Sequence, residues 1–135
     1  MKILVIDGQG GGVGKALVEK VNSRIKNADI IVVGTNSTAT VNMMKGAAVS
    51  GATGENAVVY NCKSADVIVG PIGIIMANAM LGEITPKMAE AVSSSGAHIF
   101  LVPMNQCHAQ VVGVQEKKLT EYLEEIADGI AKLQM

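Results

Sequence analysis

The residues with the clearest chemical potential are five glycines among the seven residues 8–14. They follow a short apolar run, residues 2–6, and precede a segment with helical periodicity, residues 13–26. Glycine lets a strand turn sharply and lets a phosphate approach the backbone, while the N–H groups and dipole of a following helix favour an anion. The spacing therefore predicts a site for a phosphate-bearing nucleotide. The alternative is a glycine-rich turn that serves packing alone.

Two known patterns compete for the detail of this turn. Gly8, Gly12 and Gly14 have the Gly-x-x-x-Gly-x-Gly spacing of the cofactor turn of short-chain dehydrogenases, whereas residues 11–15 resemble the deviant P-loop of partition ATPases. The P-loop match lacks a magnesium-binding hydroxyl, because Ala16 stands in its place. The dehydrogenase-like turn fits better, so we expect NAD(P) or another nucleotide, with a mononucleotide-binding P-loop as the alternative. The residues expected to bind it here are Asp7, Gly8, Gln9, Gly10, Gly11, Gly12, Val13, Gly14 and Lys15.

A second apolar run, residues 30–34, ends without the acidic residue that usually binds the ribose hydroxyls of NAD. Thr35, Asn36 and Ser37 follow instead. This polar cluster could hold a ribose or a 2′-phosphate, or could cap a helix. The chain also has no Tyr-x-x-x-Lys pair, so hydride chemistry would need other residues or be absent.

Gly70, Pro71 and Ile72 lie at the end of another apolar run, residues 67–70. In doubly wound sheets, ligands lie outside the carboxyl ends of the strands. These three residues therefore join the predicted cofactor site, with a purely structural turn as the alternative.

Catalytic candidates are weaker. Asn105 and His108, after the apolar run 98–102, could orient a substrate and act as a general acid or base. Glu55, in the predicted loop 51–56, could belong to a lid over the site or to a turn, and Glu83 is placed similarly. No catalytic residue is assigned, and whether the protein is an enzyme stays open.

Strands and helices alternate along the whole chain. Strands are predicted at residues 2–6, 30–34, 67–70, 98–102 and 111–114. Helices are predicted at residues 13–26, 57–62, 72–81 and 119–133, after the cap Asn36 as far as Gly46, and from Thr85-Pro86 to a C-cap at Gly96. The alternation predicts an α/β fold, a Rossmann-like, doubly wound, mostly parallel sheet of about five strands with helices on both faces. We expect residues 1–135 to form a single domain.

Composition limits the partners. A net charge of −1 and only three aromatic residues argue against nucleic-acid binding. The most apolar segment, residues 67–81, is shorter than the ~20 residues of a membrane-spanning helix and is broken by glycine and proline. Cys62 and Cys107 do not resemble a disulfide framework and, with His108, lack zinc-site spacing, so no metal site is predicted. No signal peptide is visible, and we expect a cytoplasmic protein.

Two predicted helical segments, residues 72–81 and 41–48, are apolar on nearly all sides. One small sheet cannot cover every face of such helices, so a homo-oligomer is favoured. Complete burial within one chain is the alternative.

Motifs along the chain resemble those of one family of small bacterial proteins, known only as a domain of unknown function. They are the runs 7–15, 34–36, 51–56, 70–74 and 81–86. The resemblance implies a shared fold and a shared ligand, but it supplies no activity. Three functions therefore stay open: a nucleotide-binding module, a small oxidoreductase-like enzyme, and a structural oligomer that binds nothing.

Overall fold

The computed structural model describes residues 1–104 and 108–135. Its strands are β1 (Lys2–Asp7), β2 (Asp29–Gly34), β3 (Ser50–Thr53), β4 (Val67–Pro71) and β5 (His98–Val102). Its helices are α1 (Gly12–Arg24), α2 (Ser37–Met44), α3 (Glu55–Cys62), α4 (Pro86–Ser93) and α5 (Leu119–Leu133), with a short 3₁₀ helix, η1 (Ile72–Ile75), after β4. The predicted α/β alternation is confirmed.

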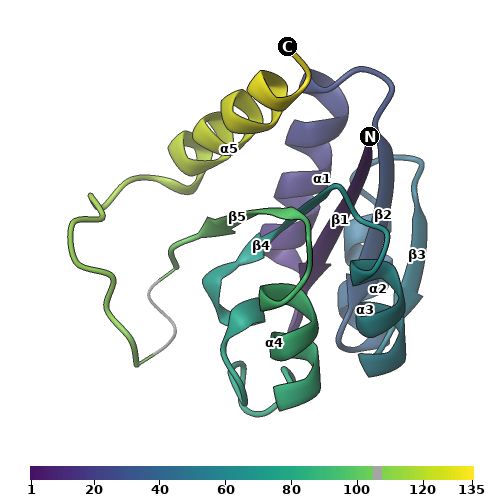
Figure 1. Cartoon of the computed structure of the whole chain (residues 1–135), viewed down its shortest axis with the longest axis vertical. Coiled ribbons are helices and arrows are strands. Elements are labelled where there is room, and N and C mark those ends of the chain that lie inside the picture. Colours follow the sequence, from purple (N-terminus) through teal and green to yellow (C-terminus); the bar gives the residue numbers. More distant parts are fainter. Residues whose placement is uncertain (105–107) are drawn as a thin grey trace.

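The five strands form one parallel sheet in the order β3-β2-β1-β4-β5 (Figure 1). Asp7, the last residue of β1, pairs with Gly34, the last residue of β2, so these strands end at the same level. The chain order reverses at β1, and ligands of such sheets bind outside the carboxyl ends at that switch point. The predicted Rossmann-like fold is therefore confirmed, and the glycine turn lies at this switch point.

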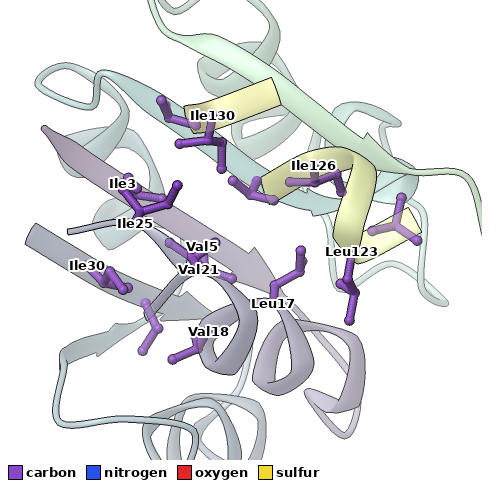
Figure 2. Packing of buried hydrophobic residues seen from close by; sticks show 14 of the residues in the cluster. Ile3, Val5, Leu17, Val18, Val21, Ile25, Ile30, Leu123, Ile126 and Ile130 are labelled. Atoms are coloured by element: carbon purple, nitrogen blue, oxygen red, sulfur yellow. The ribbon is translucent and has the colours of Figure 1, made fainter. Parts of the chain in front are cut away.

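Two apolar clusters cover the two faces of the sheet. On one face, Leu17 and Val21 of α1 and Ile126 and Ile130 of α5 belong to one cluster with inward-facing residues of β1 and β4 (Figure 2). On the other face, the cluster contains buried residues of α3 and α4. Strands covered on both sides must be apolar on both sides, which explains the uninterrupted apolar sequence of β1 and β4. No helix within the described residues is long and apolar enough to cross a membrane.

The predictions for two segments, one expected to be a loop and the other a strand, were wrong. Residues 51–56 are not a loop, because Ser50–Thr53 pairs with β2 as an edge strand and α3 begins at Glu55. Residues 111–114 do not form the fifth strand; they lie in an open segment in which Val112 is 92% exposed. The edge strand is Ser-Gly-Ala-Thr, whose small and polar residues give no apolar signal because little of it is buried.

The helix predicted at residues 72–81 was also wrong. After η1 the chain enters a compact loop in which Asn78, Met80 and Leu81 have positive φ angles, as does Gly82. Left-handed backbone cannot continue a right-handed helix. In the next helix, Thr85 caps α4 as predicted, whereas the helix ends at Ser93 rather than at the predicted cap Gly96.

Candidate functional site

The turn between β1 and α1 is anchored by the buried carboxyl group of Asp7. Its Oδ1 accepts a hydrogen bond from the N–H of Gly8 at 2.8 Å, and its Oδ2 accepts one from the N–H of Gly14 at 2.7 Å. Burial raises the pKa of Asp7, the two backbone hydrogen bonds oppose this rise, and the charge of Glu83 adds to it. Asp7 thus ties the end of the strand to the first turn of α1.

Three of the five glycines are required by packing. A Cβ at Gly8 would lie 2.7 Å from Thr35 Oγ1, and a Cβ at Gly14 would lie 2.8 Å from the Cβ of Asp7. At Gly11, the N-cap of α1, φ is +73° and a Cβ would lie 2.7 Å from the carbonyl oxygen of Ala39. These positions need glycine whether or not a ligand binds.

Gly10 and Gly12 have no such structural reason. A Cβ at either position would meet nothing within 4 Å, and neither residue has a left-handed φ angle. Glycine costs conformational entropy, so an unforced glycine in a turn needs another explanation. Close approach of a ligand to the backbone supplies one.

The same turn presents backbone donors. The first N–H groups of a helix have no intrahelical acceptor, and those of Gly12 and Val13 have no acceptor among the described residues. The carbonyl oxygen of Gln9 accepts a hydrogen bond from Asn36 Nδ2 at 3.0 Å. Because the C=O and N–H of a trans peptide point in opposite directions, this contact turns the N–H of Gly10 away from α2.

A cavity of about 460 Å³ adjoins the turn, within the range typical of small-molecule sites. It is lined by Asp7, Gly8, Gln9, Gly10, Gly11, Gly12, Val13, Pro71, Ile72, Gly73, Ala79, Met80, Leu81 and Met104. The cavity therefore combines backbone donors from the glycine turn with apolar side chains from the loop after β4.

Glu83 forms hydrogen bonds with both the glycine turn and the residues that follow β2. Its Oε1 accepts hydrogen bonds from the N–H of Gln9 at 2.8 Å, from Thr35 Oγ1 at 2.6 Å and from Asn36 Nδ2 at 2.8 Å. These bonds, that from Thr35 above all, lower the pKa of Glu83, while partial burial opposes the shift. The ionised carboxylate thus joins three segments distant in sequence.

The lowered pKa of Glu83 predicts an acid-sensitive contribution to stability. Because the folded-state pKa lies below the usual value of 4.5, the contribution is complete above about pH 4.5 and is lost as the pH falls through the folded-state value. Glu83→Gln should lack this term. We therefore expect the wild-type advantage in urea unfolding to shrink from about pH 6 to about pH 3.5, whereas a constant difference would contradict the assignment.

The predicted cofactor residues are only partly brought together. Pro71 and Ile72 line the cavity with the turn, while Gly70 is buried in β4. Lys15 does not line it, and its ammonium group lies 4.0 Å from Glu19 on the same helix, which weakens the P-loop alternative. The N–H of Gly14 donates to Asp7. Thr35 and Asn36 donate to Glu83, and Ser37 is exposed at the start of α2.

The catalytic candidates do not join this site. Asn105 lies outside the described residues, as does Cys107. His108 is exposed and lines a second cavity of about 700 Å³ beside Tyr122 of α5, which adjoins the first through the shared residues Ile72 and Met104, but His108 does not line the cavity at the glycine turn. Glu55 accepts a hydrogen bond from Thr85 Oγ1 at 2.7 Å at the start of α3. Cys62 is buried in the same helix, where burial raises the pKa of its thiol to about 11.

Sequence reasoning missed part of the apolar wall of the cavity. Ala79, Met80 and Leu81 were predicted to lie in a helix and were not expected at the site. The only signal in the sequence was the glycine at position 82, and a single glycine does not predict such a loop. In the structure, both Leu81 and Gly82 have positive φ angles. The contacts of Glu83 with the end of β2 were also missed.

Comparisons with known proteins add a family but no activity. No curated protein is significantly similar to the chain in sequence. Among solved structures, a dodecameric FMN-dependent UbiX-like decarboxylase from Escherichia coli O157:H7 aligns over 100% of this chain and 95% of that chain, with 14% identity and a TM-score of 0.46. That similarity is too low to bear on the ligand or the assembly of this protein. The model of one family matches residues 2–135, and the chain therefore belongs to the family Domain of unknown function (DUF3842).

Proposed function

We propose that this protein binds a nucleotide, specifically an NAD(P)-like dinucleotide, with its phosphates on the N–H groups of Gly10, Gly12 and Val13. The observation that carries the proposal is that Gly10 and Gly12 border the cavity although nothing in the fold would obstruct a Cβ there. Side chains at these positions would occupy the space that a phosphate needs to reach the backbone.

The electrostatics of the turn support an anionic ligand. The N-terminus of α1 carries the positive end of the helix dipole, and the first turn of α1 has no acidic side chain. Two carboxyl groups bind this turn: both oxygens of Asp7 accept backbone hydrogen bonds, and Glu83 accepts the N–H of Gln9, so neither takes the N–H groups of Gly10, Gly12 and Val13. The free N–H groups are therefore available to a phosphate.

The lining of the cavity favours a binding module over an enzyme. Among its described residues, Asp7 is the only one with a titratable side chain, and that side chain is engaged in the turn. Ile72, Met80 and Met104 instead offer an apolar surface for a flat ring. We therefore propose binding without assigning a reaction.

A matched pair of variants tests the site. Gly12→Val fills the open space at the turn, while Gly96→Val makes the same change at another exposed glycine with no atom near its Cβ, before β5. Binding of NAD⁺, NADP⁺, FMN and ATP is measured by calorimetry and by thermal shift. A ligand present at ~100 times its Kd should add about 2.7 kcal/mol of stability.

The wild-type protein and Gly96→Val should bind NAD⁺ or NADP⁺ with equal affinity, and Gly12→Val should lose at least about tenfold in affinity. If the wild-type protein binds only FMN or ATP, the proposed dinucleotide is wrong, and if it binds none of the four, a structural role is favoured. If Gly12→Val binds as tightly as the wild-type protein, the ligand site lies elsewhere.

A further inference from the structure

Although no acidic residue follows β2 in the sequence, a carboxylate from a distant part of the chain lies at the end of this strand. Glu83 comes from the loop between η1 and α4, and its Oε1 binds Thr35 and Asn36, the two residues that follow β2. In dinucleotide-binding sheets, an acidic residue at this point accepts hydrogen bonds from the ribose hydroxyls. We infer that Glu83 is the ribose-binding residue of the site and makes it select NAD over NADP.

The position of Glu83 relative to the turn supports this role, which rests on the proposed nucleotide site. The N–H of Thr35 donates to the carbonyl oxygen of Asp7 at 3.1 Å, so the end of β2 adjoins the start of the turn. A Cβ on Gly8 would lie 3.2 Å from Glu83 Oε1, and the N–H of Gln9 donates to the same oxygen. The carboxylate therefore lies beside Gly8 and Gln9, the first residues of the turn, at the edge of the cavity rather than among the residues that line it.

The chemistry of this corner distinguishes a free ribose from a phosphorylated one. Glu83 Oε1 is engaged by three donors, whereas Oε2 has no hydrogen-bond partner among the described residues and can accept from a ribose hydroxyl. A 2′-phosphate would place further negative charge against this carboxylate. None of its three partners, Gln9, Thr35 and Asn36, is basic, so that charge would be uncompensated.

Glu83 is held in place before any ligand binds. Ile84, the next residue, is completely buried, and its carbonyl oxygen accepts the N–H of Asn78 at 2.7 Å across the loop. Thr85 then caps α4 by accepting the N–H of Met88 at 3.1 Å. The residues after Glu83 thus hold its backbone, and its own hydrogen bonds hold the carboxylate, because moving away from a 2′-phosphate would break the bonds from Gln9, Thr35 and Asn36.

Titration calorimetry of NAD⁺ and NADP⁺ with three proteins tests the assignment. Glu83→Gln keeps the shape and one acceptor but removes the charge, and Glu90→Gln makes the same change on the exposed surface of α4. We expect the wild-type protein and Glu90→Gln to bind NAD⁺ at least about tenfold more tightly than NADP⁺. In Glu83→Gln, this ratio should fall by about tenfold, chiefly through tighter binding of NADP⁺.

The other outcomes distinguish failure of the Glu83 assignment from failure of the proposed nucleotide site. If the wild-type protein binds both dinucleotides equally, or Glu83→Gln leaves the ratio unchanged, the assignment of Glu83 is wrong while the proposed nucleotide site stands. Tighter binding of NAD⁺ by Glu83→Gln would also overturn it, since Glu83 would then compete with the ligand for its donors. If neither nucleotide binds to any of the three proteins, the proposed function fails, and the inference fails with it.

Discussion

A Gly11→Ala variant should lose on the order of 2–4 kcal/mol of its free energy of unfolding. Two independent costs add at this position. The φ angle of +73° disfavours any L side chain, and the new Cβ would lie 2.7 Å from the carbonyl oxygen and 2.9 Å from the Cα of Ala39. Both atoms belong to the backbone of α2, so no side-chain rotation relieves the clash, and α1 and α2 must move apart.

Gly10→Ala, one residue earlier, is the matched control. Its Cβ would meet nothing within 4 Å and its φ angle is not left-handed, so its stability should stay within about 1 kcal/mol of the wild-type value. Urea unfolding of the three proteins, followed by circular dichroism, measures the difference. Equal stability of the two variants would show that α2 does not constrain Gly11 as the structure indicates.

Elements with local signals could be predicted from the sequence. Thr85-Pro86 combines a capping hydroxyl with a proline in the first turn, and Asn36 has a side-chain oxygen that accepts the N–H of Ala39 at 2.8 Å. The turn after β1 was placed correctly because glycines between an apolar run and a helical period constrain the backbone locally. Each of these features depends on residues only a few positions apart.

Features that depend on distant contacts could not be predicted. Glu83 and Gln9 are separated by 74 positions, and nothing near Glu83 in the sequence indicates that its carboxylate binds the glycine turn. The apolar run 72–81 has the composition of a buried helix. Its residues instead form η1 and a loop in which Asn78, Met80 and Leu81 have positive φ angles, and Leu81 is 99% exposed.

At the edges of the sheet, local strand propensity gave the wrong prediction. Val111, Val112 and Val114 have the β-branched side chains typical of strands, yet they lie exposed in an open segment. Ser50–Thr53 has weak strand propensity but pairs with β2 from Ile31 to Gly34. At an edge, tertiary context therefore decides which segment pairs, and strand propensity alone does not.

The second large effect should come from Asp7→Ala, which we expect to lower the free energy of unfolding by roughly 2–5 kcal/mol. The variant leaves the N–H groups of Gly8 and Gly14 without their acceptors, and both residues are buried. The variant also removes the unfavourable burial of a charge, which is what raises the pKa of Asp7, and this gain offsets part of the loss. Two unsatisfied donors outweigh that gain, since each costs about 1–3 kcal/mol.

The raised pKa gives the same variant a pH signature. Folded Asp7 holds its proton to a higher pH than the unfolded chain, whose value is near 3.8, so its contribution to wild-type stability declines as the pH rises through this window. The difference between wild type and Asp7→Ala should therefore be larger near pH 4 than near pH 7. This sign is opposite to that expected for Glu83, whose contribution is lost on acidification.

Asp29→Ala is the control, because Asp29 lies exposed at the start of β2, at the other end of the sheet, and its backbone N–H bond to Met1 is kept. Its stability should stay within about 0.5 kcal/mol of wild type. Chemical unfolding at neutral pH then compares the truncation of a buried, hydrogen-bonded aspartate with that of an exposed one. If both variants were equally stable, the hydrogen bonds of Asp7 would not anchor the turn, and the N–H groups of Gly12 and Val13 would lose the fixed backbone that the proposed phosphate site requires.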